Sequence, residues 1–164
     1  MNLFAVVFGL LNSLSVAAAP TVLPSPPTPG TWPLISHHVV QGFEPPSHAY
    51  GAGHRGVDLL GTLATPVYAA RDGTVSFAGP LAGRGVVVID HGDTRTTYEP
   101  VDPTVTAGTS VAAGDQIGRL EVNQSHCFPD ACLHWGWINN ADDTYRDPLD
   151  LVATTQRVRL LPLA

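Results

Sequence analysis

The sequence predicts an antiparallel all-β domain, either a β-sandwich or a part-open barrel. Apolar runs between residues 34 and 153 are short and are separated by glycine. No stretch of about 12 residues repeats its apolar positions every 3.6 residues, as an amphipathic helix would. The 164-residue chain also contains 16 Gly and 15 Pro, which favour turns over long helices.

The expected strands follow one another along the chain at 66–70, 73–79, 85–92, 95–98, 110–111, 116–120 and 132–138. The segment 85–92 gives the strongest signal, because it is rich in β-branched Val and Ile and is bounded by glycine. A Gly-Asp-Thr turn at 92–94 joins it to 95–98, so we expect these two segments to form an antiparallel hairpin.

The last of these strands has two different faces. Successive side chains of a strand point to opposite sides. One side carries the residues expected to pack on the core, namely Leu133, Trp135 and Trp137. The other side carries those expected to line an open groove, namely Cys132, His134 and Gly136.

The two ends of the chain differ from its middle. Residues 1–19 are expected to be a signal peptide, with an apolar stretch followed by three alanines at 17–19; the alternative is a short buried helix. The apolar stretch is shorter than the roughly 20 residues of a membrane span, so we expect no transmembrane segment after signal removal. Residues 20–33 contain six prolines and are expected to be a linker, 34–153 the folded domain and 154–164 a C-terminal tail.

The charge balance excludes some partners. Eight Arg and no Lys stand against 14 acidic residues, which gives a net charge of −6. Such a chain has no basic patch for nucleic acid or an anionic membrane surface. Nothing in the sequence argues against a monomer, and we expect one.

The two cysteines, Cys127 and Cys132, are separated by four residues. In an exported protein an even number of cysteines indicates a disulfide first. The alternative is a pair of zinc thiolates.

A candidate metal site combines two segments. His54 and Asp58 lie four positions apart in a glycine-containing extended segment, and His134 lies on the groove face of the last strand. Three protein ligands with one open position are typical of a catalytic zinc site. The alternative for His54 and Asp58 is a surface histidine and a turn aspartate.

Motifs over about 100 residues resemble the lysostaphin-like, LytM-type zinc endopeptidases of bacterial cell walls. In order they are Gly-His-Arg-Gly-Val-Asp-Leu (53–59), Pro-Val-Tyr-Ala-Ala-Arg-Asp-Gly-Thr-Val (66–75), Gly-Val-Val-Val-Ile-Asp-His-Gly (85–92), Thr-Thr-Tyr (96–98), Ala-Ala-Gly-Asp-Gln-Ile-Gly (112–118) and Leu-His-Trp-Gly (133–136).

The resemblance implies a β-sandwich-like core with a groove that holds one Zn²⁺, bound by His54, Asp58 and His134. It implies peptidoglycan stem or cross-bridge peptides as substrate and a secreted, cell-wall-associated bacterial protein. It gives His91 a structural role in the central hairpin.

The sequence departs from that family at two positions. Active members carry Tyr-x-His and His-x-His, where this chain has Pro100 and Cys132 in place of the two histidines that do not bind zinc. His126 is the first candidate replacement, because a Cys127–Cys132 disulfide would swing its loop toward the zinc. Glu99 is the second, although strand alternation directs it to the face opposite residue 100. A third possibility is that Cys132 is a fourth zinc ligand, which would close the site.

These observations favour an exported zinc metallo-endopeptidase acting on peptidoglycan cross-links through zinc-activated water. The alternative is a catalytically degenerate module that keeps the groove and the zinc ligands and binds the cell wall or regulates a hydrolase. The third hypothesis is a purely structural domain that is stabilised by its disulfide.

Overall fold

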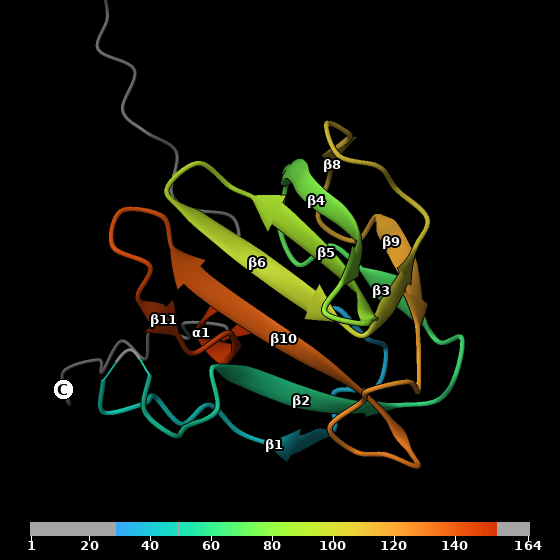
Figure 1. The fold of residues 1–164 in the computed structure, drawn as a ribbon. Coiled ribbons are helices and arrows are strands. Elements are labelled where there is room, and N and C mark those ends of the chain that lie inside the picture. Colours follow the sequence, from blue (N-terminus) through green and yellow to red (C-terminus); the bar gives the residue numbers. More distant parts are fainter. Residues whose placement is uncertain (1–28, 49, 154–164) are drawn as a thin grey trace, which may run out of the picture.

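Two antiparallel sheets make up the computed structural model, which describes residues 29–48 and 50–153 (Figure 1). The expected signal peptide, residues 20–28 of the expected linker and the expected tail at 154–164 lie outside the described residues.

The larger sheet has eight strands, which are β1 (Val39–Gln41), β2 (Gly56–Gly61), β4 (Gly73–Leu81), β5 (Arg84–Asp90), β6 (Thr94–Glu99), β8 (Ser110–Val111), β10 (Ala131–Asn139) and β11 (Tyr145–Arg146). Their order is β1-β2-β10-β6-β5-β4-β8, and β11 pairs with β10. Strand β10 therefore lies between β2 and β6, although all three are far apart in sequence (Figure 1).

The smaller sheet has three strands in the order β3-β9-β7, with bounds β3 (Pro66–Tyr68), β7 (Val101–Pro103) and β9 (Gln116–Leu120). The single helix among the described residues is the one-turn α1 (Leu149–Val152). The all-β prediction is confirmed, and so is the hairpin, because β5 and β6 pair in antiparallel register from Val87–Tyr98 to Asp90–Arg95.

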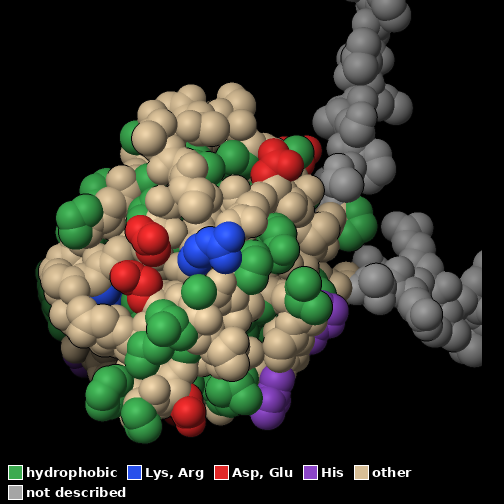
Figure 2. All heavy atoms as spheres, turned by 90° about the vertical axis from the view of Figure 1, so that its right-hand side faces the viewer, with side chains coloured by type: hydrophobic (Ala, Val, Ile, Leu, Met, Phe, Trp, Pro, Cys, Tyr) green, Lys and Arg blue, Asp and Glu red, His purple; other side chains and the backbone are tan. Residues whose placement is uncertain are grey.

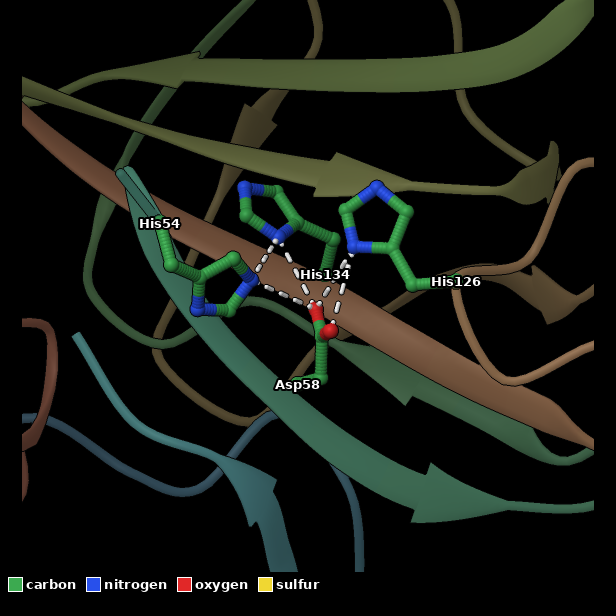
Figure 3. A group of neighbouring side chains, drawn as sticks. All are labelled: His54, Asp58, His126 and His134. Carbon is green, nitrogen blue, oxygen red and sulfur yellow. Dashed lines mark hydrogen bonds and ion pairs between the residues drawn. The ribbon is translucent and has the colours of Figure 1, made fainter. Parts of the chain in front are cut away.

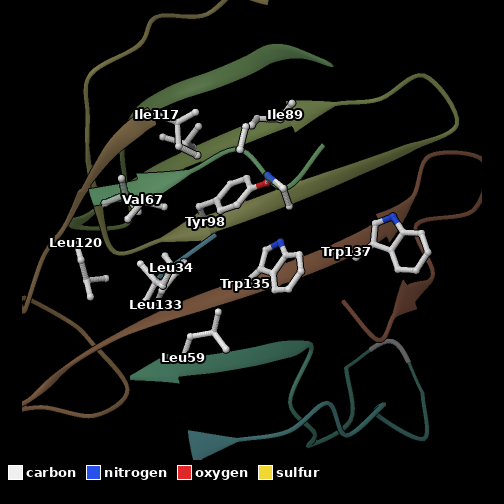
Figure 4. Close-up of a cluster of buried hydrophobic side chains, with 14 of the residues drawn as sticks. Leu34, Leu59, Val67, Ile89, Tyr98, Ile117, Leu120, Leu133, Trp135 and Trp137 are labelled. Carbon is white, nitrogen blue, oxygen red and sulfur yellow. Dashed lines mark hydrogen bonds between the residues drawn. The ribbon is translucent and has the colours of Figure 1, made fainter. Parts of the chain in front are cut away.

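The hydrophobic core joins one face of the larger sheet to the smaller sheet (Figure 4). β10 contributes Leu133 and Trp135, both fully buried, and Trp137, which is 8% exposed, as the alternation predicts. Facing them from the smaller sheet lie Val67, Val101, Ile117 and Leu120. Burying a large apolar side chain stabilises the fold by about 1.5–3 kcal/mol, so this face of β10 fixes the strand that carries His134 on its other face.

Tyr98 on β6 is a polar anchor within this core. Its hydroxyl accepts a 2.9 Å hydrogen bond from the backbone N–H of Ala70 and lies 2.9 Å from the hydroxyl of Thr96. Burial raises the pKa of Tyr98 to about 12, so the phenol stays neutral and keeps these bonds.

Residues 30–33, which we expected to belong to the linker, hydrogen-bond to the domain. Gly30 N–H donates to the carbonyl of Leu151 at 2.7 Å, and Thr31 N–H donates to that of Ala70 at 2.8 Å. Trp32 stacks on His37 with ring centroids 4.4 Å apart and packs against the core.

Charged side chains are sparse on the surface, as the 13% charged composition requires. On the face drawn in Figure 2, acidic and basic groups are scattered among hydrophobic and uncharged ones. None of the helices in the described part of the chain is long and apolar enough to cross a membrane.

Candidate metal centre

The pairing of β2 with β10 brings Asp58 and His134 together. The two residues are direct partners in the antiparallel register, so their side chains leave the sheet on the same face. His54 comes just before β2, and its backbone exchanges hydrogen bonds of 2.7 and 2.9 Å with Glu44. This bridge fixes His54 four residues before Asp58, so that its ring lies over the same face of the sheet.

Four side chains converge on this face: His54, Asp58, His126 and His134 (Figure 3). One nitrogen or oxygen of each lies within 4.8 Å of the others. Nδ1 of His134 is 2.9 Å from Oδ1 of Asp58 and 3.1 Å from Nε2 of His54, and that nitrogen is 3.2 Å from the same Oδ1.

These separations fit a tetrahedral zinc ion. Ligands at about 2.0–2.1 Å from Zn²⁺ in a tetrahedron lie about 3.3–3.4 Å from one another. The three distances within His54, Asp58 and His134 fall 0.1 to 0.5 Å short of this value, so small rotations of the side chains would open the site to the metal. Two imidazoles and a carboxylate are also the donor types that zinc prefers.

The tautomer of His54 is set by the backbone. Its Nδ1 lies 2.7 Å from the carbonyl oxygen of Gly42, which can only accept a hydrogen bond. Nδ1 therefore carries the proton, and the lone pair of Nε2 points at Asp58 and His134. This arrangement, in which a carbonyl orients a ligand histidine, is typical of metal sites.

Asp58 is the central anion of the group. Only 1% of its side chain is exposed. Burial alone would raise the pKa of Asp58, but the hydrogen bond from His134 and the charges of the three histidines hold this pKa below its usual 3.8. The carboxylate is therefore ionised at neutral pH and available as a ligand.

His126 reaches the group from the loop between β9 and β10. Its Nδ1 lies 3.2 and 3.1 Å from the two carboxylate oxygens of Asp58. The side chain of His126 is 43% exposed, against 7% for His54 and 13% for His134. His126 thus stands at the mouth of the site, and the other donors lie below it.

Cys127 and Cys132 form a disulfide, as the even number of cysteines indicated. The two sulfurs are therefore not free thiolates, and Cys132 is not a fourth zinc ligand. The disulfide ties the His126 loop to β10 on the groove face.

Glu99 lies on the groove face, directly opposite His134 in the β6–β10 register. Alternation alone suggested only that it faces away from residue 100. Its carboxylate is 2.9 Å from the guanidinium of Arg84, and Glu99 is not one of the four converging residues. The structure thus brings His126, but not the Glu99 carboxylate, to the donor group.

His91 has the expected structural role. Its Nδ1 lies 2.7 Å from the carbonyl oxygen of Asp72, and its Nε2 lies 2.9 Å from the hydroxyl of Thr96. Both ring nitrogens therefore have partners within the central hairpin and its neighbours.

Sequence reasoning missed Ser125. Its side chain is buried, and its hydroxyl accepts hydrogen bonds from the backbone N–H groups of Cys127 and Cys132 at 3.2 and 2.9 Å. The sequence does place a serine directly before His126 in an expected loop. Serine hydroxyls in loops often form hydrogen bonds with nearby backbone groups, so this position could have indicated such a role.

Curated proteins with similar sequences are mycobacterial. Uncharacterized protein Rv2891 of Mycobacterium tuberculosis (strain ATCC 25618 / H37Rv) is 47% identical over 137 residues, which cover 81% of this chain and 55% of that protein. Uncharacterized protein Mb2915 of Mycobacterium bovis matches with the same values. The chain spans about half the length of these relatives.

Solved structures with similar folds include two peptidases and the protein Csd3. The antimicrobial peptidase lysostaphin from Staphylococcus simulans aligns with a TM-score of 0.60 at 26% identity, over 70% of this chain and 49% of that one. Helicobacter pylori Csd3 aligns with a TM-score of 0.60 at 25% identity, over 78% and 34%. A zinc-containing peptidase from Vibrio cholerae shares the fold, with a TM-score of 0.61 at 22% identity over 78% and 40%.

The family profile that matches this chain is that of peptidase family M23, and the match runs over residues 52–148. That range is more than half of the chain, and it includes all four converging residues. The chain therefore belongs to peptidase family M23, the lysostaphin-like peptidases.

Proposed function

We propose that this chain is an exported zinc metallo-endopeptidase that hydrolyses peptide bonds in the stem or cross-bridge peptides of peptidoglycan. The observation that carries the proposal is the convergence of His54, Asp58, His126 and His134 on one face of the larger sheet. Family membership supports peptide-bond hydrolysis. The zinc-containing peptidase of Vibrio cholerae, which has a similar fold, supports the metal. The resemblance of the sequence motifs to cell-wall endopeptidases supports the peptidoglycan target.

One Zn²⁺ would be held by Nε2 of His54, a carboxylate oxygen of Asp58 and Nδ1 of His134. When bound there, zinc supplies Lewis-acid chemistry, which lowers the pKa of a water molecule and polarises a peptide carbonyl. The carbonyl of Gly42 keeps the lone pair of His54 directed at the site, and the neighbouring histidines keep Asp58 ionised.

His126 is the proton-transfer group. Because it is the most exposed of the four side chains, it faces the groove from which substrate and water arrive. Its Nδ1 donates to the Asp58 carboxylate, so its other ring nitrogen, Nε2, takes the proton of the attacking water and delivers it to the leaving amine nitrogen. A general base in this position contributes about 10²–10⁴-fold to the rate.

Export accords with the apolar segment at 1–19 and with the disulfide, which persists in oxidising compartments. The folded domain then acts outside the cell, as a monomer associated with the cell wall.

The second candidate function is a binding module, favoured by Pro100 and Cys132 at the positions of the usual family histidines. In that case the groove grips a stem peptide or a partner hydrolase, and the metal has a structural role.

The experiment is release of soluble peptides from purified cell wall by the zinc-loaded chain, identified by mass spectrometry. We expect release that stops with a zinc chelator and in His134→Ala. His38→Ala is the matched control, because this exposed histidine lies outside the four converging residues, and it should release peptides at the wild-type rate. Zinc-loaded protein that binds cell wall without releasing peptides would overturn the hydrolase and support the binding module.

A further inference from the structure

The loop that carries His126 is fastened at its base. It spans residues 121–130 between β9 and β10, and the Cys127–Cys132 disulfide ties its second half to β10. The buried hydroxyl of Ser125 accepts hydrogen bonds from the backbone N–H groups of both cysteines and lies 3.4 Å from the sulfur of Cys132. The residues on both sides of His126 are therefore fixed to the strand.

This attachment sets where the His126 ring lies. Cys132 precedes His134 by two residues on β10, so the two side chains leave the strand on the same face. Tying Cys127 to Cys132 places the next residue back along the chain, His126, directly over Asp58 at 3.1–3.2 Å. The other three donors do not need this loop, because they come from β2, from β10 and from the residues just before β2.

We infer that the Cys127–Cys132 disulfide is a positioning element that holds His126 at the mouth of the metal centre, so that hydrolysis depends on the oxidised state of these cysteines. The inference rests on the proposed function for its kinetic part. Cys132, at the position of a missing family histidine, thereby helps to bring a histidine from another part of the chain to the same site.

Reduction should separate turnover from metal binding. A water-soluble phosphine reduces the disulfide to two thiols. Phosphorus gives up an electron pair, takes the oxygen of one water molecule and becomes a phosphine oxide, and the two sulfurs take the electron pair and the two protons of that water. Asp58 and His134 stay on the paired strands β2 and β10, and His54 stays bridged to Glu44, so the reduced protein keeps its zinc. His126 leaves its place over Asp58, and kcat falls.

The test is a double-mutant cycle on the zinc-loaded full chain with purified cell-wall peptides. Variants are Cys127→Ser with Cys132→Ser, His126→Ala, and all three changes combined. We expect the cysteine pair to lower kcat by about 10-fold or more, with KM within about twofold and one zinc per chain retained. The combined variant should lose no more than His126→Ala alone, because both changes remove the same imidazole. Asp130→Ala, an exposed change in the same loop, is the matched control and should leave kcat unchanged.

Two kinetic outcomes would overturn the inference. An unchanged kcat in the cysteine variant would show that His126 needs no tether. A higher kcat of the zinc-loaded variant together with weaker zinc binding would show that His126 is a fourth ligand that closes the site.

A second readout does not need hydrolysis. In Co²⁺-loaded protein the ring protons of His126 should show large paramagnetic NMR shifts, which should shrink in the cysteine variant. Equal shifts in both proteins would overturn the positioning role. If the wild-type chain hydrolyses nothing while the shifts differ as expected, the proposed function fails and the positioning role stands.

Discussion

Gly56 leaves no room for a side chain beneath His134. A Cβ added at this position would lie 2.9 Å from both Cε1 and Nε2 of His134, and closer still to the carbonyl oxygen of Trp135. Ordinary van der Waals contacts lie at 3.4–4 Å. In Gly56→Ala the contact with the Trp135 carbonyl forces β2 and β10 apart, and the His134 ring must also retreat by about 0.5 Å, the difference between 2.9 and 3.4 Å.

This displacement is large for a metal ligand. Ligand distances in a working site stay within about 0.2 Å of their preferred values, so zinc affinity should fall by about 10-fold or more. Crowding of the strand pair should also lower the free energy of unfolding by about 1–3 kcal/mol. Zinc affinity is measured by competition with a chromogenic chelator, and the fold is checked by circular dichroism.

Gly42→Ala is the matched control. No atom lies within 4 Å of a Cβ built on Gly42, and the Gly42 carbonyl that orients His54 is retained. Its zinc affinity should equal that of the wild type. A folded Gly56→Ala protein that binds zinc within about twofold of the wild type would show that a side chain at residue 56 does not displace His134.

Three further predictions concern buried polar groups. Tyr98→Phe should lower the free energy of unfolding by about 1–3 kcal/mol in denaturant titrations, because the buried N–H of Ala70 loses its acceptor; an unchanged value would contradict this. Burial lowers the pKa of His91, so the unfolded chain binds the proton more tightly and the free energy of unfolding falls as the pH drops below about 6.5. His91→Gln should flatten this part of the stability profile of metal-free protein. A slope equal to that of the wild type would contradict this prediction. Burial acts to raise the pKa of Asp58, but the neighbouring histidines hold this pKa below 3.8, so stability is lost as the pH falls from about 4 downward. Thermal melts of metal-free Asp58→Asn should lack this loss of stability. The same loss in the variant would count against the ion pairs of Asp58 with the histidines.

Alternation along β10 was enough to predict which of its residues enter the core. Trp135 is buried and His134 lies on the opposite face with the other converging residues, because successive side chains of a strand must point to opposite sides. The order of the motifs was enough to predict the family and to identify His54, Asp58 and His134 as candidate zinc ligands, which do lie together.

The sequence left the rest of the site open because it depends on contacts between distant residues. The place of Glu99 follows from the register of β6 with its two neighbours, which puts it opposite His134 and within reach of Arg84. The expected disulfide was enough to name His126 as a candidate, but the position of its ring also depends on the hydroxyl of Ser125, which leaves no periodic pattern in the sequence.

The central claim is that His126 does the work of the histidines missing at residues 100 and 132. The most direct test is kcat for peptide release from purified cell wall by zinc-loaded His126→Ala, with zinc content measured on the same samples. We expect a loss of about 10²–10⁴-fold with one zinc per chain retained. A variant that keeps its zinc and releases peptides at the wild-type rate would contradict it.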